Sequence, residues 1–316
     1  MRRSATFIRA AWNHAKAGAS INLGPIAVNL RLSRAVPVSN NQARRARAWV
    51  RSLVGWPSPA GLVAGREAQQ HRASGTDAKV ASARTGVIVG VGQGLGMALA
   101  HRLASDGMKL ALVSRNATRL DPLVTKLRAS NPKIYAYGCD ATNERSVKSI
   151  MGMIEKDLGT PNLVIYNVQS FTPGSILDTE VAAFEEAWRA NCLGAFIVGR
   201  ESARLMAREQ RGTVIFVGGT SSRIGRDGYL NLAVGKFGLR ALAQVMAREL
   251  GPHGIHVVHL VVDADIAAHD SWQDNAGQMR SEDLAELICS LHAQPRSVWT
   301  HELDVRPWNE KFWEHC

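Results

Sequence analysis

The chain has 316 residues, and its 38 lysines and arginines against 27 aspartates and glutamates give a formal net charge of +11. The excess lies in residues 1–84, which hold 14 basic and 2 acidic residues, so the remainder is nearly neutral with 24 and 25. A neutral body offers no basic surface to nucleic acid, and no apolar run is long enough to span a bilayer. We therefore expect neither a nucleic-acid partner nor an integral membrane segment.

Residues 1–82 form a basic extension without an apolar pattern large enough for a core of its own. Its first stretch can form an amphipathic helix with Phe7, Ile8 and Trp12 on one side and basic residues at the back. Arginine-rich, acid-poor amphipathic segments are typical of mitochondrial presequences. The sequence therefore favours a transit peptide and a mitochondrial location. A disordered basic arm or a misassigned start codon, in a cytoplasmic protein, are the alternatives.

The body begins with a βαβ pattern. Residues 85–89 form a short apolar run of the kind found in buried parallel strands, and a glycine-rich turn follows it. A helix is predicted over residues 97–105 and a second strand over residues 110–113. Glycines let backbone N–H groups approach a diphosphate at the positive end of the helix. The turn therefore predicts a dinucleotide site, with these candidate residues: Gly90, Gln93, Gly94, Leu95 and Gly96.

The end of the second strand indicates which dinucleotide is bound. A site for NAD usually offers the adenosine ribose a carboxylate here, but this strand runs into Ser114, Arg115 and Asn116. Arg115 can pair with a 2′-phosphate, which a carboxylate would repel. The sequence therefore favours NADP(H), with a solvated surface arginine as the alternative. A third predicted strand leads to Asp140 and Ala141, where Asp140 is positioned to hold the adenine amino group.

Together these residues resemble the short-chain dehydrogenase/reductase family, whose dinucleotide loop has the glycine spacing found between residues 90 and 96. The resemblance extends from about Thr85 to Pro307. It implies an α/β fold with one doubly wound, Rossmann-type parallel sheet and helices on both faces. We therefore expect a single dinucleotide-binding domain over residues 83–316, preceded by the basic extension.

The resemblance also assigns residues beyond the glycine-rich turn. After the fourth predicted strand the family usually has Asn-Asn-Ala-Gly, and only Asn167 of this chain matches that motif. We therefore expect Asn167 to be a cofactor-binding residue. Asn191, in a long predicted helix, would hold a water in a proton relay. Ser222, after the fifth predicted strand, would orient the substrate, and Ser221 is the alternative if the loop is shifted by one residue.

The Tyr-x-x-x-Lys motif of the family is incomplete in this chain. Lys236 is present and would bind the nicotinamide ribose, but Leu232 stands at the tyrosine position and cannot donate a proton. Tyr229 is a candidate substitute, because residues three and seven apart share one face of a helix. The alternative is a tyrosine at the mouth of the helix that lines the pocket rim, since Gly228 precedes it.

The C-terminal part departs further from the family. Asp263 and Ala264 replace its Pro-Gly after the sixth predicted strand. Residues 265–279 look like the mobile segment that closes over the substrate in this family. Ser281 is expected to cap the last helix, and a final strand is predicted near residues 300–304.

Aromatic residues in the tail, Trp308, Phe312 and Trp313, predict contact with a neighbouring subunit, and therefore a homodimer or homotetramer. Neither the four cysteines nor the ten histidines have metal-ligand spacing, so no metal site is expected. His253, His256 and His259 are interpreted as structural.

Two functions compete on this evidence. The leading hypothesis is an NADP(H)-dependent oxidoreductase that transfers a hydride to a carbonyl or conjugated double bond of a small, apolar substrate, with Tyr229 or a water as proton donor. The other is a catalytically inactive pseudoenzyme that keeps NADP(H) in a structural or sensing role. Loss of the tyrosine favours the pseudoenzyme, whereas retention of Asn191, Ser222 and Lys236 favours the enzyme.

Overall fold

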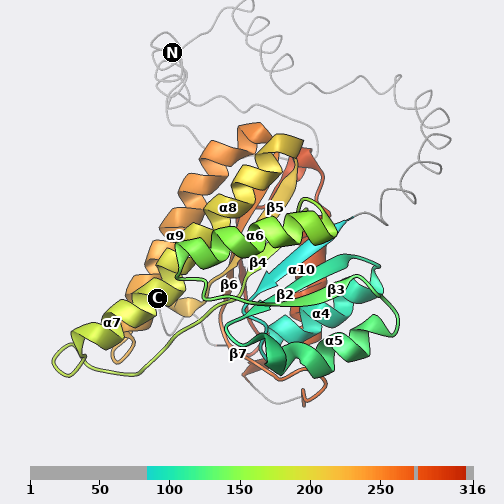
Figure 1. Ribbon diagram of the computed structural model, residues 1–316. Coiled ribbons are helices and arrows are strands. Elements are labelled where there is room, and N and C mark those ends of the chain that lie inside the picture. The colour runs from blue at the N-terminus through green and yellow to red at the C-terminus, as the bar shows by residue number, and fades with distance from the viewer. Residues whose placement is uncertain (1–83, 274–276, 311–316) are drawn as a thin grey trace, which may run out of the picture. The chain divides into compact units, whose positions relative to one another are not determined.

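A computed structural model describes residues 84–273 and 277–310, and the basic extension predicted over residues 1–82 lies outside them. Seven parallel strands form one sheet in the order β3-β2-β1-β4-β5-β6-β9 (Figure 1). The chain moves outward from β1 to β3 and then returns to build the other half from β4, so the strand order reverses between β1 and β4. The predicted doubly wound fold is confirmed. The strands are β1 (Thr85–Val89), β2 (Lys109–Ser114), β3 (Ile134–Gly138), β4 (Leu163–Tyr166), β5 (Gly212–Val217), β6 (Ile255–Val262) and β9 (Glu302–Val305).

The central strands are short runs of β-branched and aliphatic residues, which suit a sheet that is covered on both faces. Every residue of β1, β4 and β6 is buried. The edge strand β9 is only partly buried, and it starts two residues later than the sequence predicts. The carboxyl ends of all seven strands point the same way, so the loops that follow them meet at one edge of the sheet.

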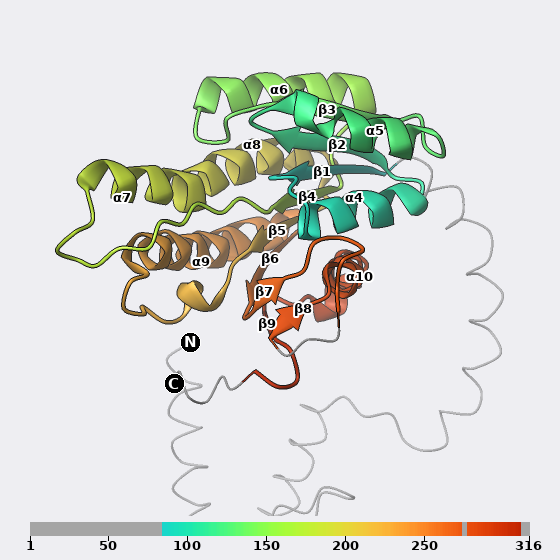
Figure 2. The ribbon, with the colours of Figure 1, turned by 90° about the horizontal axis from the view of Figure 1, so that it is seen from below.

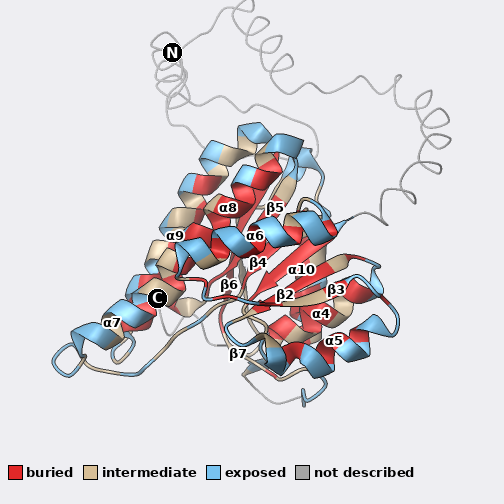
Figure 3. Cartoon of the chain, viewed as in Figure 1, coloured by how far each residue is buried: buried red, intermediate tan, exposed pale blue. Residues whose placement is uncertain are grey.

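Helices cover both faces of the sheet. The helices α4, α5 and α10 pack on one face, and α6, α8 and α9 pack on the other (Figures 1 and 2). Their inward sides and the strands form two separate apolar cores, visible as the buried residues in Figure 3. No helix among the described residues is both long and apolar enough to cross a membrane. The helices are α4 (Leu95–Ser105), α5 (Asp121–Arg128), α6 (Glu144–Leu158), α7 (Val181–Trp188), α8 (Gly194–Glu209), α9 (Leu230–Leu250) and α10 (Ser281–His292).

Helix α9 packs closely on the junction between α7 and α8, which is a single π-helical turn over Arg189–Leu193. A Cβ on Gly235 would lie 2.7 Å from Cβ of Asn191, and one on Gly238 would lie 2.7 Å from Sγ of Cys192. Only glycine permits this approach. The two glycines flank Lys236 in sequence and therefore set how deeply its helix sits.

The expected cap of the last helix is wrong. Arg280 is the N-cap of α10, and Ser281 is the first helical residue, with no side-chain cap bond. The chain is extended at Arg280 and turns inward after it, so Ser281 is fully buried and its hydroxyl has no hydrogen-bond partner in the described chain. Two short paired strands, β7 (Asp265–Ile266) and β8 (Gln278–Met279), precede the helix. Phe312 and Trp313 lie outside the described residues.

Candidate functional site

The glycine-rich turn joins β1 to the start of α4. Gly90 has a φ of +92°, and a Cβ there would lie 2.6 Å from the carbonyl oxygen of Asn167. The side-chain amide of Asn167 donates to the Gly90 oxygen at 3.0 Å. A Cβ on Gly96 would lie 2.8 Å from Cα of Val91. Glycine is therefore needed at both positions, and Asn167 supports the turn from behind.

The first turn of α4 presents backbone N–H groups that suit a diphosphate. Gly94 is the N-cap, and the N–H groups of Met97 and Ala98 are the first to bond back to the turn. The N–H groups of Leu95 and Gly96 come before them and stay available to a ligand. No acidic side chain stands in this turn to repel an anion. The predicted diphosphate site is therefore assembled by the fold.

The predicted adenosine end lies at the neighbouring strand ends. Ser114 closes β2, and its hydroxyl donates to the carbonyl of Asn116 at 2.7 Å. Arg115, between them, is exposed and forms no ion pair with a described carboxylate. Asp140, just past β3, is exposed as well, and Ala141 beside it is buried. The β2–β3 register pairs Ser114 with Gly138, so these residues share one edge of the sheet.

The segment after β6 lies over the glycine-rich turn. The carbonyl oxygen of Ala267 is 3.3 Å from the position that a Cβ on Gly94 would take. The N–H of His269 donates to the carbonyl of Gln93 at 2.8 Å. The His269 ring also stacks on His101 of α4, with ring centroids 4.6 Å apart. The first part of the segment predicted to be mobile is thus attached to the turn.

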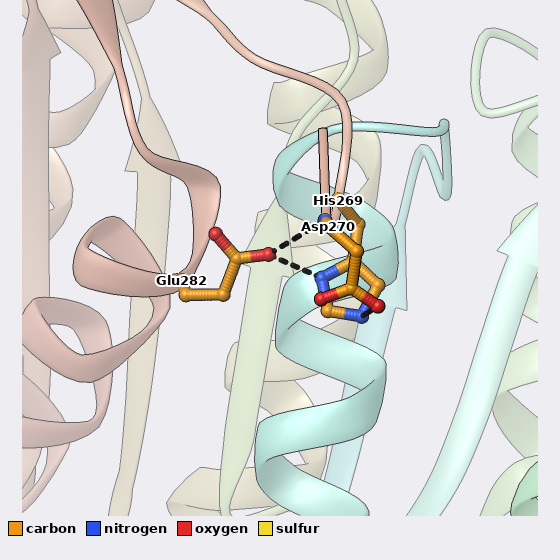
Figure 4. A group of neighbouring side chains, drawn as sticks. All are labelled: His269, Asp270 and Glu282. Carbon is orange, nitrogen blue, oxygen red and sulfur yellow. Dashed lines mark hydrogen bonds and ion pairs between the residues drawn. The ribbon is translucent and has the colours of Figure 1, made fainter. Parts of the chain in front are cut away.

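A carboxylate of α10 supports this attachment (Figure 4). Oε1 of Glu282 contacts Nδ1 of His269 at 2.5 Å and accepts the N–H of Asp270 at 3.0 Å. Burial alone would raise the pKa of Glu282, but the N–H groups of Asp270 and Glu282 and the His269 ring hold it well below its usual range. Within the described residues, these three side chains alone place possible metal ligands within 4.8 Å of one another. Their hydrogen bonds explain the arrangement without an ion, and the absence of a metal stays a prediction.

Lys236 lies at the carboxyl edge between β4 and β5, and only 2% of it is exposed. Its Nζ donates to the carbonyl of Val217, the last residue of β5, at 2.9 Å and to that of Val168, just after β4, at 3.5 Å. Burial lowers the pKa of Lys236 to about 8. The predicted ribose ligand is therefore at the sheet edge where ligands of open α/β folds bind.

Asn191 lies in the π-helical turn and is fully buried. Its amide nitrogen donates to the carbonyls of Ser170 and Ala187 at 2.7 and 2.9 Å, and its Oδ1 accepts the Ser170 N–H at 3.3 Å. These bonds attach the loop after β4 to the long helix. Asn191 therefore positions that loop. That it also binds a water of a proton relay stays a prediction.

Tyr229 does not share a helix face with Leu232 and Lys236. Helix α9 begins at Leu230, and Tyr229 is its N-cap with a φ of −112°. The Tyr229 ring is 37% exposed and stacks on Phe171, with centroids 4.7 Å apart. Leu232, at the position where the sequence predicts that the tyrosine is missing, is buried. Tyr229 thus lies at the mouth of the helix, and its place on the rim of a pocket stays a prediction.

Ser222 is enclosed rather than presented to the cleft. It ends the 3₁₀ turn η5 (Thr220–Ser222), is fully buried, and accepts the N–H of Gly219 on Oγ at 3.2 Å. A Cβ on Gly218 would lie 2.7 Å from this oxygen. Ser221 is buried as well, at 7% exposure. The turn therefore folds the hydroxyl of Ser222 inward, and its expected role in orienting a substrate stays a prediction.

His259 lies between the Ser222 turn and a partly exposed ion pair. Its Nε2 is 2.4 Å from the position that a Cβ on Gly218 would take, and its Nδ1 contacts Glu302 at 3.0 Å. Glu302 also accepts two hydrogen bonds from Arg240, at 2.6 and 2.7 Å. Burial lowers the pKa of His259 against the opposing effect of Glu302, so the neutral ring is favoured. A neutral ring that donates from Nδ1 leaves the lone pair of Nε2 toward the turn.

Two polar residues without a predicted role meet at the ends of β5 and β6. The hydroxyl of Thr220 donates to Oδ1 of Asp263, and Nη1 of Arg306 lies 3.8 Å from the other carboxylate oxygen. Asp263 is 9% exposed, and Thr220 is more accessible. The sequence offered one sign of this pair, the carboxylate in place of the usual Pro-Gly, but nothing in it identified the partner.

The chain belongs to the short chain dehydrogenase family, which it matches over residues 84–269. It is 29% identical over 179 residues to sorbitol-6-phosphate 2-dehydrogenase of Escherichia coli, across 56% of this chain and 69% of that protein. A short-chain dehydrogenase structure from Rhodopseudomonas palustris is similar with a TM-score of 0.63 and 35% identity, over 71% of this chain and 99% of that one. An alcohol dehydrogenase from Thermococcus sibiricus, complexed with 5-hydroxy-NADP, shares the fold at 21% identity with a TM-score of 0.66, over 72% and 98% of the chains.

Replacing Gly218 with alanine is expected to lower the free energy of unfolding by about 1–3 kcal/mol, as overpacking a buried site does. The new methyl group would lie 2.4 Å from Nε2 of His259 and 2.7 Å from Oγ of Ser222. Urea unfolding followed by tryptophan fluorescence measures the change. Gly225→Ala is the control, because a Cβ there has no neighbour within 4 Å. Equal stability of the two variants would contradict the close packing of Ser222 and His259 around Gly218.

The buried ammonium of Lys236 predicts a pH dependence of stability. Its pKa is about 8 in the folded protein against an ordinary 10.5, so between these values the unfolded state binds more protons. We expect the free energy of unfolding of the wild type, relative to Lys236→Met, to rise from pH 8 to pH 10 by up to about 1.4 kcal/mol per pH unit. Denaturant titrations across this range measure it. A difference that stays flat from pH 8 to pH 10 would show that the ammonium is not desolvated.

Proposed function

We propose that the chain is an NADP(H)-dependent oxidoreductase that transfers a hydride between its cofactor and a carbonyl or conjugated double bond of a small, apolar substrate. The observation that carries the proposal is Lys236, buried at the same sheet edge as the glycine-rich turn. A buried ammonium needs oxygen ligands, and the hydroxyls of a nicotinamide ribose would add to the two carbonyls that it already has. The bound nicotinamide supplies the hydride chemistry, while the chain binds, orients and exchanges protons.

The adenosine end supports NADP(H) over NAD(H). Arg115 is exposed at the end of β2, and no described carboxylate competes for its guanidinium. Its neighbours Ser114 and Asn116 are neutral, so nothing beside it would repel a 2′-phosphate. The related Thermococcus sibiricus enzyme was solved with a derivative of NADP, which is consistent with this preference.

The second candidate is a pseudoenzyme that keeps NADP(H) as a structural or sensing ligand. Two observations favour it: Leu232 fills the position of the phenol, and the hydroxyl of Ser222 is enclosed. In both cases a hydroxyl that would act on a substrate is missing or enclosed. The glycine-rich turn and Lys236, which would bind the cofactor, are unaffected. Cofactor binding is therefore common to both candidates, and only turnover separates them.

We also propose that the chain assembles as a homodimer or homotetramer. The outer sides of α7, α8 and α9 expose several large apolar side chains, which a partner subunit would cover. These are Trp188, Phe196, Val234, Phe237 and Val245, with exposed fractions between 36% and 52%. Trp308 of the tail is 92% exposed and supports the same proposal.

Arg115→Ala is expected to weaken NADPH binding by about 10-fold or more, because a charge-assisted bond contributes about 1.5–3 kcal/mol. NADH affinity should not change, since NADH carries no 2′-phosphate. Fluorescence titration of both cofactors measures the two constants. Arg119→Ala is a matched control, because Arg119 is likewise exposed and lies four residues further on. A variant that binds NADPH as tightly as the wild type would remove Arg115 from the site.

Leu232→Tyr is expected to raise the NADPH-dependent reduction of a test diketone. Lys236 lies one helical turn further on, and a positioned general acid typically contributes about 10²–10⁴-fold. Leu232→Phe is the control, since it adds the ring without the hydroxyl. A wild type and a Leu232→Tyr variant that both bind NADPH and both leave the substrate unchanged would favour the pseudoenzyme.

A further inference from the structure

The groups first expected to act on the substrate do not come together on helix α9. Leu232 has no hydroxyl, Ser222 is fully buried, and Tyr229 stands outside helix α9 with its ring on Phe171. Thr220 is the partly exposed hydroxyl of the turn that follows β5, whose other two hydroxyls, those of Ser221 and Ser222, are buried. An accessible hydroxyl therefore lies at the ends of the strands.

Thr220 and Asp263 face each other across the carboxyl ends of neighbouring strands. Thr220 follows β5 by three residues, Asp263 directly follows β6, and the hydroxyl donates to the carboxylate. The threonine is the more accessible of the two, whereas the carboxylate is 9% exposed. A substrate would thus meet the hydroxyl first, with the carboxylate behind it.

Asp263 lies among other charged side chains. Nη1 of Arg306 is 3.8 Å from its Oδ2, and Nη2 of the same guanidinium binds Asp304 at 2.5 Å. Asp304 in turn pairs with Arg223, which follows η5. The two carboxylate oxygens of Asp263 therefore have different partners: Oδ1 accepts the hydroxyl of Thr220, and Oδ2 faces the guanidinium of Arg306.

The pair lies at the strand end that holds Lys236. The ammonium bonds to the carbonyl of Val217, three residues before Thr220. Gly219, between them, has no side chain, and a Cβ there would meet only the carbonyl oxygen of Val262, at 3.4 Å. The lysine and the threonine are thus attached to the same short segment, residues 217–220, at the end of β5.

We propose that Thr220 and Asp263 form the proton-transfer pair of this site. This inference rests on the proposed function. In the oxidative direction the alcohol O–H bond breaks, its proton passes to Oγ1 of Thr220, and the threonine's own proton passes to Oδ1 of Asp263. Bound oxidised NADP would be the acceptor for the hydride that leaves the alcohol carbon with two electrons, and Asp263 later releases its proton to solvent. Reduction of a carbonyl is the reverse and begins from protonated Asp263.

The test uses full-length protein, cyclohexanol and 2-octanol as alcohols, and three variants of the pair. Asp263→Asn removes the base and is expected to lower kcat for alcohol oxidation by about 100-fold or more, with NADPH affinity within twofold of wild type. Thr220→Val is expected to lower it similarly, and Thr220→Ser to restore it. Asp265→Asn is the matched control, because Asp265 is an exposed carboxylate two residues further on.

A second readout needs neither substrate nor cofactor. In protein labelled with ¹³C at the aspartate carboxyl carbons, the Asp263 signal is identified by its loss in Asp263→Asn. Its chemical shift is expected to change in Thr220→Val, because the carboxylate loses the hydroxyl that donates to it. Arg306, Asp304 and Arg223 are the other charged groups nearby and are unchanged in this comparison.

An Asp263→Asn variant that oxidises either alcohol at the wild-type rate would overturn the pair alone. An Asp263 signal with the same chemical shift in Thr220→Val and in the wild type would also overturn the pair. A wild type that binds NADPH but oxidises neither alcohol would likewise overturn it. Failure to bind NADPH at all would instead refute the proposed function. Loss of oxidation in Thr220→Val with recovery in Thr220→Ser would support the relay.

Discussion

The site is organised around a buried ammonium, that of Lys236, on the carbonyl of Val217. A lysine loses most of its hydration when it is 2% exposed, and this loss lowers its pKa to about 8. The cost is tolerated because two carbonyls at the ends of β4 and β5 point at the same place. This contact fixes α9 against the sheet edge and aligns the rest of the site with the strand ends.

Close backbone approach makes that position possible. Gly235 and Gly238 let α9 contact the π-helical turn, and Gly218 leaves room for His259 beside Ser222. The π turn in turn holds Asn191, whose amide is bound to Ser170 and Ala187. These glycines lie outside the dinucleotide turn, yet each one sets a distance between elements that carry polar groups of the site.

The two halves of the site depend on different parts of the chain. The dinucleotide half uses backbone N–H groups and glycine conformations, which tolerate changes elsewhere in the sequence. The proton half depends on individual side chains, and here these lie at the ends of β5 and β6 instead of on α9. The pair Thr220–Asp263 and the network of His259 with Glu302 occupy that region, with Leu232 on the helix. Under the proposed relay, the proton chemistry would lie at the strand ends, while Lys236 would bind the cofactor from the helix.

The sequence by itself determined the doubly wound sheet, the glycine-rich turn and the strand-end position of Arg115, and it predicts the loss of the tyrosine at Leu232. These follow from local patterns: apolar runs of strand length, glycine spacing and the identity of single residues. Tertiary structure decided that Ser222 faces inward, that Tyr229 precedes its helix and that Ser281 is not a cap. It also decided that Thr220 meets Asp263, 43 residues later. Such outcomes depend on how a turn directs a side chain and on which strands become neighbours. Both are decided by contacts between residues distant in sequence, and these contacts form only when the sheet is assembled.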